Sequence, residues 1–140
     1  MQSIESFQGK HRFLSNFWPA RVKLDDVEYP TVENAYQAAK TLSGRHVFLS
    51  CRAGDAKRLG RGVTLRPDWE AVKVETMRGL LRQKFAAEPL RSMLIETGDA
   101  RLVEGNTWGD RFWGVCGGAG QNMLGHLLMS VRDELNGAAK

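Results

Sequence analysis

Two segments with apolar residues at helical spacing constrain the fold of this 140-residue chain most strongly. Residues 66–85 and 122–135 both place apolar side chains three or four positions apart, which is typical of a helix that buries one face. The first buried stripe is Trp69, Val72, Met77, Leu80, Leu81 and Phe85, and the second is Met123, Leu124, Leu127, Leu128, Val131 and Leu135.

Shorter signals surround these helices. Residues 20–29 alternate around Asp25-Asp26 and predict a hairpin, and Thr31 is a suitable N-cap for a helix through Leu42 that Gly44 stops. Further helices are expected at 50–59, 89–95 and 122–135, a strand at 101–104 and a glycine-rich loop at 105–120. The sum is an α+β fold, a single compact, mainly helical domain over residues 1–140 with a small antiparallel sheet.

Composition excludes several classes of protein. The chain is 42% hydrophobic and 26% charged, which excludes disorder, and it contains no run of about 18 apolar residues that would span a membrane. Residues 1–5 show no secretory signal, and Cys51 and Cys116 lie far apart. We therefore expect a cytoplasmic protein with reduced thiols, no metal and no bound cofactor. The net charge of +4 favours an anionic partner, with ordinary surface charge as the alternative.

One helical face carries an acid, an amide and an amine. Glu33, Gln37 and Lys40 are spaced at i, i+4 and i+7, so they share one stripe of the helix after Thr31. This trio would suit a sugar-phosphate substrate. Alternatively, Glu33 and Lys40 simply complement the helix dipole at its two ends.

Aromatic and basic residues provide a second set of candidates. Asn16 could present its amide to a ribose or base, and Phe17 and Trp18 could stack on a base, although aromatic residues more often belong to a core. The segment 45–66 suits phosphate contacts, or else forms a solvated helix face. Its cations are Arg45, Arg52, Lys57, Arg58, Arg61 and Arg66.

The glycine-rich loop leads into the last helix. The segments 108–114 and 117–122 could place free backbone N–H groups at a helix N-terminus, which is a site for anions, or could be a flexible surface loop. Glu104 follows the predicted strand and either faces a cleft or ends the strand. Glu33 and Glu104 together could form the acid pair that glycosidic hydrolysis uses.

In this order, these blocks resemble the YbiA-like, or NADAR, family from about Phe13 to Leu135. The resemblance rests on segments 13–17, 29–40, 56–61, 68–69, 84–85, 102–104, 110 with 113–114, and 120–125. Members of that family are N-glycosidases. Some cleave early ribosylamino intermediates of the riboflavin pathway, and others remove ADP-ribose from guanine bases, including those of nucleic acids.

The resemblance implies a YbiA-like fold and a phosphorylated riboside as substrate. It implies that Glu33 is the acidic catalytic residue and Lys40 a candidate nucleophile, and Glu104 is expected to join them. Some members have lysine where this chain has Gln121. Around the ribose, base and phosphates we expect Asn16, Trp18, Gln37, Lys57, Arg58, Arg61, Glu104, Asp110, Trp113, Gly114 and Asn122. A non-catalytic ADP-ribose-binding module is the alternative function, and a nucleic-acid-binding domain is disfavoured by the mild charge.

Overall fold

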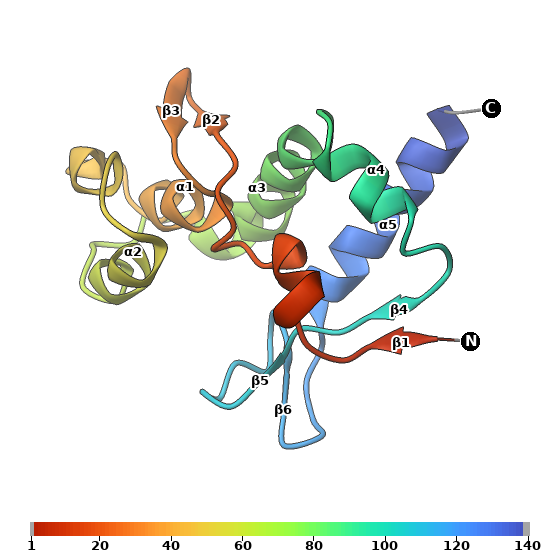
Figure 1. Ribbon diagram of the computed structural model, residues 1–140. Helices are drawn as coiled ribbons and strands as arrows, with labels where there is room; N and C mark the ends of the chain where they lie inside the picture. The colour runs from red at the N-terminus through yellow and green to blue at the C-terminus, as the bar shows by residue number, and fades with distance from the viewer. Residues whose placement is uncertain (1, 139–140) are drawn as a thin grey trace. The chain divides into compact units, whose positions relative to one another are not determined.

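The computed structural model describes residues 2–138 (Figure 1). The described residues divide into two compact units, one formed by residues 16–84 and the other by residues 2–15 together with 85–138. Helices and strands occur in both units, and helices dominate, which confirms the predicted α+β class.

The unit formed by residues 16–84 is built around one short helix, α1. It contains β2 (Val22–Leu24), β3 (Val27–Tyr29), α1 (Val32–Ala39), the 3-10 helix η2 (Arg45–Phe48), α2 (Ala53–Gly60) and α3 (Trp69–Lys84). Helix α1 contacts α2, α3, η2 and the hairpin, and every one of its side chains is buried. Its alanines allow this close approach, and Figure 1 shows the hairpin rising above it.

The predicted hairpin is confirmed and is fixed at two places. Asp25 and Asp26 have φ values of 49° and 64°, the left-handed pair that a two-residue turn between twisted strands requires. The side-chain amide of Gln83 on α3 accepts from the Lys23 N–H at 2.7 Å and donates to the Lys23 carbonyl at 2.8 Å. The outer edge of β2 is therefore hydrogen-bonded by a side chain.

Helix α1 begins where predicted and ends earlier. The Thr31 hydroxyl accepts from the Asn34 N–H at 3.0 Å, so Thr31 is the N-cap. The expected end at Leu42 is wrong, because the Lys40 carbonyl accepts from the Arg66 N–H at 2.7 Å instead of from a further helical turn. Lys40 is therefore the residue that ends α1.

The next helix also differs from the sequence prediction. Helix α2 was expected from Ser50 to Leu59 but spans Ala53–Gly60. Arg52 precedes it in an extended conformation, and η2 occupies residues 45–48. Burial of Phe48 favours this 3-10 turn. A turn of four residues is too short for a periodic pattern of apolar residues to predict it.

The other unit packs helices against short strand pairs. It contains β1 (Ser3–Ile4), the 3-10 helix η1 (Gly9–Leu14), α4 (Leu90–Ile95), β4 (Arg101–Leu102), β5 (Gly105–Asn106), β6 (Val115–Cys116) and α5 (Met123–Ala138). Strand β4 pairs in parallel with β1, β5 pairs in parallel with β6, and α5 contacts β4 and α4. The predicted strand over 101–104 is thus only two residues long, and the predicted loop at 105–120 contains two strands.

Helix α5 begins one residue later than predicted. Asn122 has a φ of 52° and therefore lies outside the helix. None of the helices in residues 2–138 has the length and apolar character needed to cross a membrane.

Candidate active site

Glu33 and Gln37 form a buried pair on α1. Their side chains retain only 8% and 4% exposure. The Gln37 Nε2 donates to Glu33 Oε2 at 2.5 Å, as the i, i+4 spacing predicted. A carboxylate that is buried away from water requires hydrogen-bond donors. The Gln37 donor therefore allows the Glu33 carboxylate to stay buried inside this unit.

Lys40 completes this stripe and is half-buried. Burial lowers the pKa of the Lys40 amine below its ordinary value, and the cations Arg61, Lys57 and Lys73 lower it further, whereas Glu33 opposes them. The Lys40 Nζ lies 5.5 Å from the centroid of the Tyr36 ring. The sum of these effects enlarges the neutral, nucleophilic fraction of the amine.

Asn16 lies beside the first turn of α1. Its backbone carbonyl accepts from the Glu33 N–H at 3.1 Å, and its Nδ2 contacts the Met77 sulfur at 3.6 Å. The buried Asn16 Oδ1 has no hydrogen-bond partner among residues 2–138. A buried acceptor of this kind favours a ligand that brings an N–H or O–H donor. Its neighbour Trp18 is half-buried.

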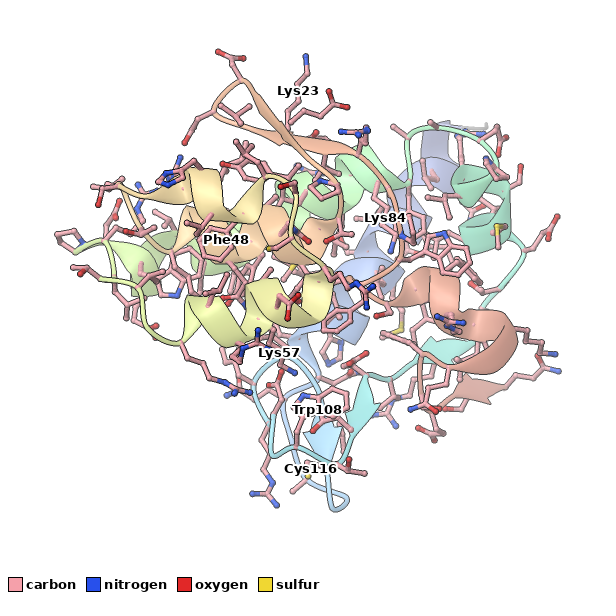
Figure 2. All side chains as sticks on the ribbon, turned by 60° about the vertical axis from the view of Figure 1, so that its left-hand side comes forward. Lys23, Phe48, Lys57, Lys84, Trp108 and Cys116 are labelled. Carbon is pink, nitrogen blue, oxygen red and sulfur yellow. The ribbon has the colours of Figure 1, made fainter. Side chains whose placement is uncertain are left out.

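The predicted phosphate contacts fall into two groups. Lys57 and Arg61 lie close enough to Lys40 to lower its pKa, and Figure 2 shows Lys57 projecting from α2. Arg58 does not belong to this group, because its guanidinium pairs with Asp55 at 2.8 Å on the exposed face of α2. Arg45 and Arg66 are likewise paired, with Asp25 and Asp68.

In the other unit, Asn122 fixes the backbone at Glu104. The Asn122 Oδ1 accepts from the Glu104 N–H at 2.9 Å, and its Nδ2 donates to the Leu102 carbonyl at 2.9 Å. The Glu104 carbonyl accepts from the Val115 N–H. Both backbone groups of Glu104 are thus engaged, and the Asn122 amide serves the protein backbone.

Asp110 and Gly114 shape the loop around Glu104. The Asp110 Oδ1 accepts from the backbone N–H groups of Phe112 and Trp113, at 3.2 and 2.9 Å, which closes a tight turn. A Cβ at Gly114 would lie 2.2 Å from the Glu104 carbonyl oxygen, so glycine is required there. Trp113 is half-buried and meets Phe112 edge-to-face. Figure 2 shows Trp108 and Cys116 in this loop region.

The sequence left open whether backbone N–H groups at the N-terminus of α5 are available to bind an anion. The N–H groups of Asn122, Met123 and Leu124 donate to the carbonyls of Gly114, Phe112 and Trp113, at 2.9–3.2 Å. These donors are therefore satisfied by the loop itself, and the glycines serve its close packing. The sequence cannot show this, since the same glycine pattern occurs in loops that fold onto a helix and in loops that cradle a ligand.

The structure therefore brings the predicted residues together within two sets, each inside its own unit. Asn16, Glu33, Gln37 and Lys40, with Lys57 and Arg61, form one set, and Glu104, Asp110, Trp113, Gly114 and Asn122 form the other. Among residues 2–138 no group of three His, Cys, Asp or Glu side chains is arranged to hold a metal ion.

Two residues of the first set were not predicted. Lys73 of α3 adds to the positive field at Lys40. Gly60 of α2 packs against Gln37, where a Cβ would lie 1.8 Å from Oε1. In the sequence Gly60 indicates only a helix end, and Lys73 lies 33 positions after Lys40, so neither carries a local signal of the site.

Comparison with known proteins identifies the family. The NADAR domain family matches residues 5–136. The N-glycosidase YbiA of Escherichia coli is 42% identical over 130 residues, which cover 86% of this chain and 79% of that protein. The solution structure of E. coli YbiA superposes with a TM-score of 0.84 at 36% identity, over 99% of this chain and 89% of that one.

A longer relative contains this region as one part. A riboflavin biosynthesis protein of Vibrio vulnificus is 41% identical over 132 residues, but the chain spans only 36% of that protein. The predicted resemblance to this family is confirmed. The predicted enzymatic class, the hydrolysis of N-glycosyl bonds, is confirmed at the level of these relatives. The chain belongs to the NADAR family, the family that also contains the N-glycosidase YbiA.

Proposed function

We propose that this chain hydrolyses the C1–N bond of a phosphorylated riboside, with Glu33 and Lys40 as its catalytic groups. The observation that carries the proposal is the stripe on α1, where a buried carboxylate lies within electrostatic range of a half-buried amine whose pKa is lowered. A module that only binds nucleotides has no need of that pair.

Glu33 suits the charge that develops when the base departs. Breaking the C1–N bond gives C1 oxocarbenium character, and the electron pair passes to the nitrogen of the base, which takes up a proton. A buried carboxylate stabilises the cationic sugar or deprotonates the attacking water. The Gln37 hydrogen bond keeps this carboxylate in one orientation.

Lys40 suits a covalent route through the same bond. Its neutral amine attacks C1 as the base leaves, and the ring then opens to an imine between Nζ and C1. Water adds to C1, the C1–Nζ bond breaks, and the free sugar and the amine are regenerated. The lowered pKa of Lys40 favours the neutral form that this attack requires.

The surroundings support a riboside that carries phosphate. Lys57 and Arg61 supply positive charge beside Lys40. The Asn16 Oδ1 is a buried acceptor for a sugar hydroxyl or a base N–H. Among phosphorylated ribosides, similarity to the riboflavin biosynthesis protein of Vibrio vulnificus favours a ribosylamino-pyrimidine phosphate of flavin synthesis, and ADP-ribosylated guanine is the second candidate.

Product analysis by mass spectrometry tests the proposal. Wild-type protein is incubated without added metal with the ribosylamino-pyrimidine phosphate and, separately, with guanine-ADP-ribosylated DNA. We expect ribose 5-phosphate from the first; free ADP-ribose from the second alone would assign the reversal of base ADP-ribosylation. Neither product, with tight ADP-ribose binding, would establish the binding module instead.

Removal of the Glu33 carboxylate gives the first testable prediction. E33Q should fold normally and lose on the order of 10²–10⁴ in kcat/KM, the usual contribution of a general acid or base. The control is E75Q, which changes an exposed glutamate of α3 paired with Arg78. Full activity in E33Q would exclude the catalytic role of Glu33. In the same assay, E104Q tests the predicted role of Glu104.

A further inference from the structure

Gly60 is a glycine that its backbone does not require. It is the last residue of α2 and has a helical conformation that any residue adopts. A Cβ built on it would lie 1.8 Å from Oε1 and 2.6 Å from Cδ of Gln37. The bare Cα of Gly60 is therefore packed directly against the side-chain amide of Gln37, and that contact explains the glycine.

The other side of the same amide faces Glu33. The Gln37 Nε2 donates to Glu33 Oε2, while Oε1, on the Gly60 side, has no hydrogen-bond partner among residues 2–138. Exchanging the two amide atoms would place an oxygen against the carboxylate, so Glu33 fixes which atom faces it. Both ends of the amide are thus in contact with protein.

We propose that Gly60 and Gln37 are positioning residues for Glu33. Gly60 leaves the space that the Gln37 amide occupies, and the amide holds the Glu33 carboxylate in one orientation and stabilises its ionised form. In this role Gln37 acts through Glu33, whereas the sequence suggested a contact with the substrate. The catalytic consequence rests on the proposed function, whereas the arrangement itself does not.

The variant G60A tests this without removing any functional side chain. The atoms nearest to that Cβ all belong to the Gln37 side chain, so we expect the Gln37 amide to move. The matched control is G79A in α3, where a Cβ would meet nothing within 4 Å. Both variants exchange a helical glycine for alanine, and both should retain the circular dichroism spectrum of the wild type.

The kinetic expectation separates positioning from binding. With the ribosylamino-pyrimidine phosphate as probe, G60A should lower kcat on the order of tenfold, the effect of losing one charge-assisted hydrogen bond, and leave KM nearly unchanged. Q37M, which keeps the length and removes the N–H, should behave like G60A, and the double variant should be no worse than Q37M alone.

A readout without substrate keeps this inference independent of the proposed function. The NMR titration of the Glu33 carboxyl carbon should have a higher midpoint in G60A and Q37M than in wild type and G79A. If wild type cleaves neither substrate, the proposed function fails while this titration still decides the arrangement. A Glu33 midpoint in G60A equal to that in G79A, or a raised KM with unchanged kcat in Q37M, would overturn the proposal.

Discussion

Lys40 is the residue whose chemistry depends most on its neighbours. Burial lowers the pKa of its amine, and three cations from α2, α3 and the turn after α2 act in the same direction. Glu33 acts against them. A lysine in such a field remains a compact base and nucleophile, which an arginine at the same position would not be.

The electrostatic field at Lys40 can be changed by mutating a neighbouring residue while Lys40 itself stays in place. Because Arg61 lowers the pKa of Lys40, R61Q should raise that pKa and move the rising limb of the pH–rate profile to higher pH. R58Q is the matched control, since Arg58 pairs with Asp55 and does not act on Lys40. Profiles of kcat against pH for the three proteins measure this, and identical limbs in R61Q and wild type would contradict it.

The sequence predicted which side chains lie together better than it predicted what those side chains bind. The i, i+4 pair of Glu33 and Gln37 follows from helix geometry alone, and the structure contains it. Asp110 and Asn122 were expected near the ribose and base, but the side-chain hydrogen bonds described above all join them to backbone groups. Short polar side chains serve turns and ligands with the same atoms, so a sequence cannot separate the two uses. Their contact with substrate stays a prediction.

At the scale of elements, Asn34 ties α1 to the segment that precedes α2. Its Nδ2 donates to the carbonyls of Phe48 and Cys51, both at 2.9 Å, and its Oδ1 accepts from the Thr31 hydroxyl at 2.6 Å. The Asn34 side chain is fully buried. One residue therefore joins the N-cap of α1 to the end of η2 and the approach to α2.

The loss of this side chain should destabilise the protein measurably. N34A removes the donor to the buried Phe48 carbonyl and to the part-buried Cys51 carbonyl, and we expect a loss of about 1–3 kcal/mol in the free energy of unfolding. T64A, at an exposed position, is the control and should change little. Urea unfolding followed by circular dichroism measures both. Equal midpoints for N34A and T64A would show that these hydrogen bonds contribute nothing net.

Elements with local signals were predicted, and those held by distant contacts were not. The hairpin, the N-cap of α1 and the long helix α3 each follow from residues within one segment. Strand β1 has two residues, and its partner β4 lies nearly a hundred positions away. Strands β5 and β6 pair with each other inside the glycine-rich loop, Gly105 with Val115, and are also only two residues long. Two-residue strands form because other contacts hold them together, and periodicity cannot detect them.

At the scale of the whole molecule, one buried lysine couples stability to pH. Lys84 is only 2% exposed, and its burial lowers the pKa of the amine to about 7. In the unfolded chain the same amine titrates at its ordinary, much higher pKa. Between these two values the unfolded state binds more protons than the folded state, so stability rises with pH across that range.

The variant K84M tests this coupling. The free energy of unfolding of the wild type should increase as the pH rises from 7 towards 10. Lys84 should contribute up to ~1.4 kcal/mol per pH unit to that increase. K84M should lack that contribution, so the wild-type free energy of unfolding minus that of K84M should increase with rising pH. Urea titrations at four pH values measure it; a difference that stays constant would exclude a titrating Lys84.

Domain number is the whole-molecule property that the sequence predicted least securely. Length and composition suggested one domain over residues 1–140, and the contacts separate two compact units, the second of which joins both ends of the chain. A unit built from distant segments has no linker or change in composition to mark it. The single-domain expectation stays a prediction.

The two hydrogen bonds between the Gln83 amide and the Lys23 backbone affect how the protein behaves in concentrated solution. An exposed strand edge is a template on which a second molecule can add a strand. Here the outward N–H and C=O of β2 are already bonded by a side chain of the same molecule. That edge of the hairpin is therefore unavailable for strand addition, and Gln83 protects the protein against edge-to-edge aggregation.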